Sequence, residues 1–435
     1  MPAACVTLPF VRATTQHDLL RFRMRAGMTR AVGDYDEILE DYKLHASLHP
    51  TSAEAWLHIG QAHSDLADEL LLGTASEIIE NRHDIAVLQR AALACVVQAK
   101  QLLEPQSVYG GTSSTDQSVK SEDHELIHRL HIRVYSLAGR LVYSIAARPL
   151  PLLALQVLPS NILIDDDDNS CQKWDLGRWR DSSAHSLSRS LSRRYTALPP
   201  RSTVYKLARA MLRRASQLDP TNWKWVYQAG KTAAKLDEPL AACTFYLKAS
   251  HLAVSAELSS AASSTGLPPT GTIPDSAFDP MCKLLSTLTK LLYTQRTDAT
   301  TAQHFIDALP CSVASSESGL NGGDDYSVSA TSGVDAASAR VFAVIRRTLE
   351  SMCASDKRRW HHRSVFWMAW MDHHLFGNSE RAKQALLTLL QMRNTNKQLA
   401  SFYKTNFEAP GKHYLYLEKY LLLYIETLET TQDIE

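Results

Sequence analysis

The sequence predicts an all-α protein, built as an irregular tetratricopeptide-like helical repeat array with long disordered loops. Three observations support this prediction. Two segments share one spacing of proline, large apolar residue and glycine. Apolar and aromatic residues recur at helical intervals, while the alternation typical of strands is nearly absent. Stretches rich in Ser, Thr, Gly and Pro separate the helical segments.

The repeat signal begins near the N-terminus. Trp56 and Gly60 follow Pro50 by six and ten residues, and the segment after Pro220 repeats these offsets, ending at Gly230. The second unit continues with the alanine and aromatic pattern of tetratricopeptide repeats, at Ala242, Tyr246 and Ala249. Because glycine and alanine leave room for a neighbouring backbone, we expect helices to approach closely at these positions, with the tyrosine filling the adjacent gap.

The repeats and the linkers divide the chain into five helical segments. These are an N-terminal repeat region at 1–104, a segment at 125–158, a tetratricopeptide-like repeat at 204–258, a segment at 281–310 and a C-terminal block at 335–435. The linkers lie at 105–124, 159–203, 259–280 and 311–334. Their low hydrophobicity cannot offset the entropy lost on ordering, so we expect them to be disordered.

Aromatic residues dominate the C-terminal block. Trp360, Trp367 and Met371 have helical spacing, Gly377 and Asn378 predict a helix end, and Ser379 is a candidate cap for a second helix. After a break at Pro410 and Gly411, a third helix is predicted from Lys412 to Leu428. Its inward residues are Tyr416, Tyr420, Leu423 and Tyr424.

Composition limits the classes of function. The 435 residues carry a formal net charge of zero, which does not predict bulk attraction to nucleic acid or to anionic membranes. The seven cysteines include no Cys-x-x-Cys pair, so reduced, buried thiols in an intracellular protein are the favoured interpretation. The N-terminus lacks the pattern of a signal peptide, and the uncharged stretch from Pro149 to Ile164 is too short to cross a bilayer. We therefore expect a soluble, intracellular protein.

No catalytic, cofactor-binding or metal-binding residues are predicted. The pairs His361-His362 and His373-His374 are too far apart on a helix to share one ion, and neither has a carboxylate four residues on. Structural histidines are the favoured interpretation. No nucleophile motif or phosphate-binding glycine loop occurs, so an enzyme is not expected.

A basic stretch from Arg178 to Arg214 leaves two interpretations open. It contains ten Lys and Arg residues against Asp181 alone, and clustered cations of this kind contact nucleic acid. A disordered linker open to phosphorylation explains the Ser/Arg alternation equally simply and is favoured.

Several blocks resemble the histone transcription regulator 3 / calcineurin-binding protein cabin family. The C-terminal blocks are Trp360 to Arg363, Glu408 to Tyr416 and Lys419 to Glu426, and the earlier blocks are Trp56 to Gly60, Leu88 to Leu93 and Trp223 to Lys231. Here Lys412 replaces the usual Arg of the family, and Tyr414 replaces its Phe. The chain is shorter than is usual for the family, so we expect a fragment or a reduced form.

This resemblance implies a nuclear scaffold subunit of the HIR histone chaperone complex, which assembles nucleosomes outside replication and affects transcription. The implied partners are WD-repeat and ubinuclein-type subunits, with core histones bound through the complex, DNA contacted only indirectly and no membrane. A generic tetratricopeptide-like adaptor for peptides or RNA-processing factors is the alternative. The partner-binding candidates are Trp360, His361, His362, Arg363, Pro410, Gly411, Lys412, His413, Tyr414 and Tyr416.

Overall fold

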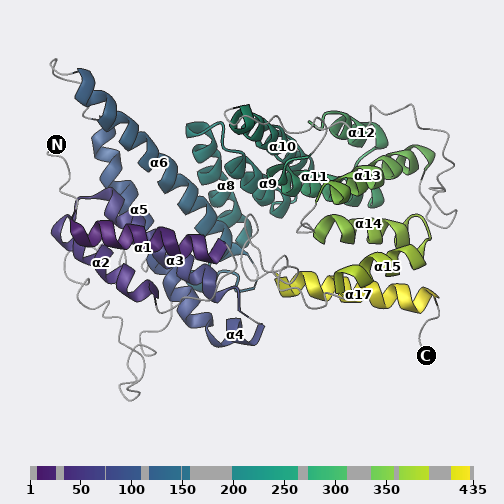
Figure 1. Cartoon of the computed structure of the whole chain (residues 1–435), viewed down its shortest axis with the longest axis horizontal. Helices are drawn as coiled ribbons and strands as arrows, with labels where there is room; N and C mark the ends of the chain where they lie inside the picture. Colours follow the sequence, from purple (N-terminus) through teal and green to yellow (C-terminus); the bar gives the residue numbers. More distant parts are fainter. Residues whose placement is uncertain are drawn as a thin grey trace.

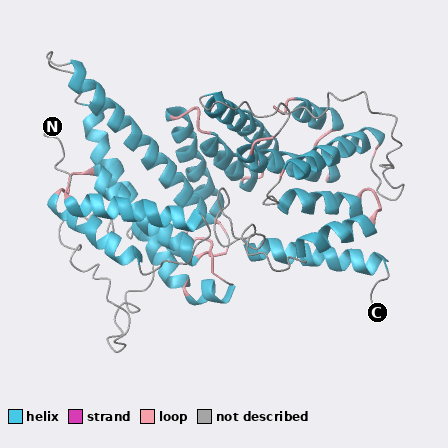
Figure 2. Ribbon diagram, in the orientation of Figure 1, coloured by secondary structure: helices cyan, strands magenta, loops and turns pink. Residues whose placement is uncertain are grey.

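The computed structural model describes residues 7–25, 34–73, 75–108, 117–147, 149–156, 198–262, 273–310, 335–356, 362–390 and 413–431. Within these ranges the regular structure is helical and contains no strand (Figure 2). The all-α prediction is therefore confirmed. The helices follow one another along an elongated array, with α1 and α2 towards one end and α15 and α17 towards the other (Figure 1).

The N-terminal half contains two long helices, of 27 and 30 residues, and several shorter ones. Its elements are α1 (Leu8–Arg25), α2 (Asp34–Leu48), α3 (Ala53–Leu70), α4 (Ala75–Glu80), α5 (Arg82–Val108), α6 (Gln117–Ala146), a 3-10 turn at Leu153–Leu155 and α8 (Arg201–Leu218). The remaining helices are α9 (Trp223–Lys235), α10 (Pro239–Ala262), α11 (Asp275–Tyr293), α12 (Ala299–Asp307), α13 (Ala336–Ser355), α14 (His362–His374), α15 (Ser379–Leu390) and α17 (His413–Thr431).

The first predicted repeat is the pairing of α3 with α5. Ser52 caps α3, because its side chain accepts a hydrogen bond from the backbone N–H of Ala55. A Cβ added at Gly60 would lie 3.2 Å from both the Ala92 carbonyl oxygen and the Cys95 Cβ on α5. The close approach expected at Gly60 is confirmed.

The second predicted repeat is the pairing of α9 with α10. The side chain of Asn222 caps α9 through the backbone N–H of Lys224. A Cβ at Gly230 would stand only 2.7 Å from Tyr246 Cε1, and Tyr246 is 2% exposed. The tyrosine fills the gap beside the glycine, as the repeat pattern predicts.

A third close approach was not predicted from the sequence. On α6, a Cβ at Gly139 would lie 2.6 Å from Leu212 Cγ of α8. Gly139 belongs to no proline-spaced unit, so the repeat pattern gives no signal for it. This contact joins the N-terminal bundle to the helix that precedes the α9–α10 pair.

An extended apolar core runs from α9 to α14. Its fully buried members include Tyr227, Tyr246, Phe278, Phe342 and Met371. Trp367, assigned from its spacing to the same helix face as Met371, packs against this core as a partly buried side chain. The core therefore connects the repeat pair to the first helix of the C-terminal block.

Helices extend into parts of the predicted linkers. Helix α5 runs to Val108 and α6 begins at Gln117, inside the linker assigned to 105–124. Helix α11 begins at Asp275, six residues before the predicted start, and includes the buried Pro280. The composition of 259–280 predicts a linker that ends at Pro280, whereas the structure places this proline inside the helix. The linker at 311–334 and nearly all of 159–203 lie outside the described residues.

The predicted turn between α14 and α15 is present, but its cap is a different residue. Gly377 has a positive φ of 65°, which suits a residue without a side chain at a helix end. The side chain of Asn378, and not Ser379, accepts a hydrogen bond from the backbone N–H of Arg381 at 3.0 Å. Ser379 is the first residue of α15, and its hydroxyl is hydrogen-bonded to His373 at 2.9 Å.

Candidate partner-binding site in the C-terminal helices

Helices α14, α15 and α17 form a small layer at one end of the array (Figure 1). Their shared apolar cluster consists of Ala369, Ala382, Leu386, Leu389, Tyr420 and Leu423. Tyr420 and Leu423 are buried and Tyr424 packs against the cluster as a partly buried residue, as the helical spacing predicts. The layer is thus a packed unit and gives fixed positions to the polar side chains that surround it.

His362, a predicted partner-binding residue, lies inside this layer. Its Nδ1 and the Tyr420 hydroxyl are 2.6 Å apart and share a hydrogen bond. The ring of Phe366 stacks on Tyr420, with the ring centroids 4.6 Å apart. These contacts join α14 to α17. Because His362 is only 8% exposed, it presents little surface to a partner.

Arg363, the next candidate, joins α14 to α11. Its guanidinium forms an ion pair with the carboxylate of Asp279, and the two side chains are 11% and 13% exposed. A mostly buried, paired arginine holds its partner helix in place. The structure therefore places both described residues of the Trp360 to Arg363 block in contacts between helices.

A buried ion pair joins α13 to α14. Arg346 Nε donates to Asp372 Oδ1 at 2.9 Å, and its Nη2 donates to Oδ2 at 3.1 Å. The side chains are 3% and 2% exposed. A further ion pair, between Arg381 Nη2 and Glu350 Oε1 at 3.3 Å, extends the network towards the surface. In the sequence, Arg346 lies beside the apolar positions of α13, which suggests that its side chain is buried. This position does not show that Asp372 is its partner.

The other candidates are not placed by the structure. Trp360, His361, Pro410, Gly411 and Lys412 lie outside the described residues. His413, Tyr414 and Tyr416 belong to the first turns of α17, and their side chains also lie outside the description. Their role in partner binding stays a prediction.

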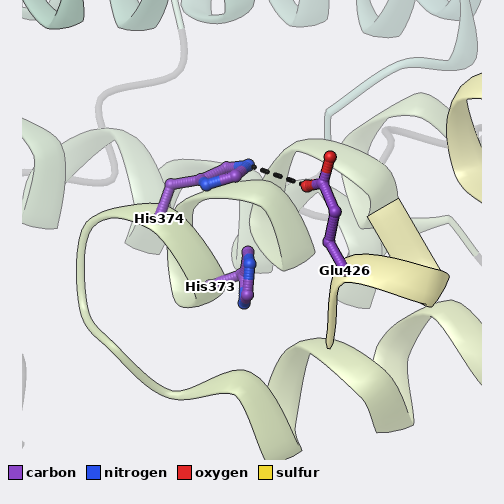
Figure 3. Close-up of side chains that lie close together, drawn as sticks. All are labelled: His373, His374 and Glu426. Atoms are coloured by element: carbon purple, nitrogen blue, oxygen red, sulfur yellow. Dashed lines mark ion pairs between the residues drawn. The ribbon is translucent and has the colours of Figure 1, made fainter. Parts of the chain in front are cut away.

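A cluster of two histidines and one glutamate joins the end of α14 to α17 (Figure 3). His374 Nε2 lies 3.7 Å from Glu426 Oε2, and the His373 and His374 rings have centroids 4.7 Å apart. Burial lowers the pKa of both imidazoles, and Glu426 opposes this effect. Spacing within one helix gives no signal for this cluster, because Glu426 lies on another helix, 52 residues after His374.

The thiols among the described residues have a structural character. Cys95, Cys243 and Cys282 are buried, and Cys353 is partly buried. Burial raises the pKa of Cys95, Cys243 and Cys353 to about 12 each, which strongly disfavours the nucleophilic thiolate. These four cysteines form no disulfide, which agrees with the prediction of reduced thiols.

Among the helices in the described ranges, none is both long and apolar enough to cross a membrane.

Two family models match the chain, one after the other. Residues 2–219 match the HIR3 helical bundle domain, and residues 257–435 match the HIR3 TPR domain. The first match covers α1 to α8, and the second covers the end of α10 through α17. The tetratricopeptide-like description of the fold is thus supported independently of the repeat spacing.

Curated fungal proteins named "Histone transcription regulator 3 homolog" are similar to the chain. The protein of Candida glabrata is 21% identical over 96% of this chain, and that of Candida albicans is 21% identical over 88%. The protein of Yarrowia lipolytica is 34% identical over a shorter stretch, 20% of this chain. The matched regions span 24%, 20% and 5% of these relatives, so the chain corresponds to a quarter of their length or less.

Proposed function

Because this chain belongs to the HIR3 family, we propose that it is a non-enzymatic scaffold subunit of a HIR-type histone chaperone complex in the nucleus. In this role it supports nucleosome assembly outside replication and the regulation of transcription. Its proposed partners are the WD-repeat and ubinuclein-type subunits, with core histones bound through the complex. The observation that carries the proposal is the order of the two family matches, which together cover most of the chain.

The architecture supports a scaffold. An elongated helical array offers a large surface, and repeat proteins of this kind use such surfaces for binding. Polar groups of α13, α14 and α17 form pairs that hold these helices together, such as Arg346 with Asp372 and His362 with Tyr420. The cysteine thiols with strongly raised pKa values also favour a structural role over a nucleophilic one.

Affinity purification of the tagged chain from nuclear extract tests this proposal. We expect a WD-repeat subunit, an ubinuclein-type subunit and core histones to be recovered together. Recovery of RNA-processing factors or peptide ligands without these proteins would instead support a generic tetratricopeptide-like adaptor. Folding of the tagged chain should be verified by circular dichroism, because the expected helical signal is strong.

Two lysines provide a matched comparison for the candidate surface. Lys412 is the predicted partner-binding cation before α17, where the helix dipole disfavours positive charge, so its presence there suggests another use. Lys419 lies seven residues later and is exposed. We expect Lys412→Ala to reduce recovery of the partners several-fold, and Lys419→Ala to leave it unchanged. Equal recovery with both variants would remove Lys412 from the proposed interface.

A further inference from the structure

We propose that His373, His374 and Glu426 form a binding site for a divalent transition metal, of which Zn²⁺ is the best match. Three ligand atoms, one from each residue, lie within 4.8 Å of one another. Two imidazole nitrogens and one carboxylate oxygen are a donor set that zinc accepts with three protein ligands. This proposal departs from the expectation of no metal, which considered one helix at a time.

The surroundings hold both imidazole rings in place. His373 Nδ1 is hydrogen-bonded to Ser379 Oγ at 2.9 Å, which directs its Nε2 away from α15. The ring of Trp370 packs against His374, with centroids 4.7 Å apart. A hydrogen bond to the second ring nitrogen commonly fixes the orientation of a metal-binding histidine. The Ser379 hydroxyl would therefore be the outer hydrogen-bond partner of a metal-binding His373.

The distances allow an ion to enter after small movements. Ligand atoms around a tetrahedral zinc ion are roughly 3.3 Å apart, which follows from bond lengths of about 2.0 Å. The His374 to Glu426 separation of 3.7 Å is close to this value. The side chain of Glu426 is 51% exposed and that of His374 is 27% exposed, so both can adjust and the site is open to solvent. A water molecule can supply the fourth ligand.

The protonation states also suit a metal. Zinc binds neutral imidazole, and burial lowers the pKa of His373 and His374 below the ordinary value of 6.5. The carboxylate of Glu426 supplies one negative charge, which partly compensates the dication.

Metal binding here would fasten α17 to α14. The His362 to Tyr420 hydrogen bond already joins these helices near the start of α14, and the metal would join them at its end. A ligand that binds the folded state alone stabilises it by mass action. Zinc should therefore raise the melting temperature of the protein.

The test uses the complete chain after removal of metal with a chelator. Zn²⁺ titration by calorimetry should show one tight site, and Co²⁺ should give visible absorption bands in the same stoichiometry. His374→Gln and Glu426→Gln should each weaken zinc affinity by about tenfold or more. His304→Gln and Glu429→Gln are matched controls, since both residues are exposed and lie outside the cluster. The controls should bind zinc like the wild type.

The opposing results are equally distinct. Absence of stoichiometric zinc binding would overturn the proposal and leave His374 and Glu426 as an ordinary polar contact. Binding that persists in His374→Gln and Glu426→Gln would also overturn it, because the ion would then occupy other residues among the 17 histidines. Circular dichroism of each variant separates loss of the site from loss of the fold.

Discussion

The α9–α10 pair is joined by apolar contacts, with Gly230 against the ring of Tyr246, whereas the α13–α17 block adds buried polar pairs to its apolar contacts. In the first region, a small residue and a large one meet across neighbouring helices in the chain. In the second, a buried ion pair joins the consecutive helices α13 and α14, and a hydrogen bond joins α14 to α17 across 58 residues of sequence. The two regions thus differ in the polar pairs between their helices, although one apolar core extends from α9 to α14.

The two regions therefore respond to different kinds of substitution. An added atom should harm the repeat pair, because there is no space between its helices. Removal of one charge should destabilise the C-terminal block, because the buried partner of that charge would then have no opposite charge beside it.

Removal of Asp372 should have the largest effect. Asp372→Ala would leave the 3% exposed guanidinium of Arg346 without its bidentate partner, and such losses cost about 3–5 kcal/mol. Unfolding in urea measures this free energy, with the exposed Glu418→Ala as a control. The double variant Arg346→Met, Asp372→Leu should recover most of the loss. An effect of Asp372→Ala equal to that of the control would show that polar pairs do not hold the block.

Acid should weaken the N-terminal bundle through His63. This buried histidine has a pKa lowered to about 4 by burial, so between pH 6.5 and 4 the unfolded chain binds the proton and the folded chain does not. Stability is then lost as pH falls through this window, by about 2–3 kcal/mol between pH 7.5 and 4.5. The comparison of wild type with His63→Gln in urea, at both pH values, isolates this contribution.

Asp68 acts on the bundle in the opposite direction. Burial raises its pKa to about 7, so its neutral form favours the folded state at acid pH and this contribution is lost as pH rises. The Asp68 side chain is 26% exposed, and its Oδ2 lies 4.0 Å from Arg140 Nη2. Both features limit the contribution of Asp68 to the pH dependence of stability. Asp68 is present in both wild type and His63→Gln, so the difference between their free energies of unfolding is independent of it. If this difference does not change with pH, the assignment of the pH dependence to His63 is wrong.

Gly230→Leu tests the apolar half of the comparison. The first added atom would already stand 2.7 Å from Tyr246 Cε1 and 3.0 Å from Phe245 Cβ. Overpacking of this kind costs roughly 1–3 kcal/mol or more. Gly60→Ala is the milder counterpart, since its nearest contacts would be at 3.2 Å and alanine favours a helix. Thermal melting followed by circular dichroism measures both, and an unchanged melting temperature for Gly230→Leu would show that the repeat assignment is wrong.

Tyr420→Phe should have the smallest effect of the four. It removes the 2.6 Å hydrogen bond to His362 but keeps the stacked ring against Phe366, so the expected cost is about 1 kcal/mol. Tyr424→Phe is the control, because Tyr424 is only partly buried. Equal urea unfolding curves for the two variants would mean that the His362 contact adds no stability.

Sequence reasoning reached the repeat pair because its signal is local. Gly230 and Tyr246 are 16 residues apart, and each occupies a position that the repeat pattern defines. The all-α class and the inward positions of Tyr420, Leu423 and Tyr424 on α17 followed from helical periodicity in the same way. The shift of the α15 cap from Ser379 to Asn378 is a small error, since both residue types cap helices well.

The polar contacts of the C-terminal block could not be predicted in this way. His362 and Tyr420 are separated by 58 residues, and Glu426 approaches His374 from a different helix. Periodicity assigns a residue to a face of its own helix, but it does not show which helix covers that face. The sequence therefore identified His362 as notable without showing that its partner is internal.

Hydrogen exchange of the purified chain, alone and bound to the WD-repeat subunit, tests the central proposal most directly. We predict that binding slows exchange in α14 and α17, and that the α9–α10 pair is already protected in the free chain and changes little. Added protection confined to α1 to α6, with α14 and α17 unchanged, would contradict the assignment of the partner surface to the C-terminal block.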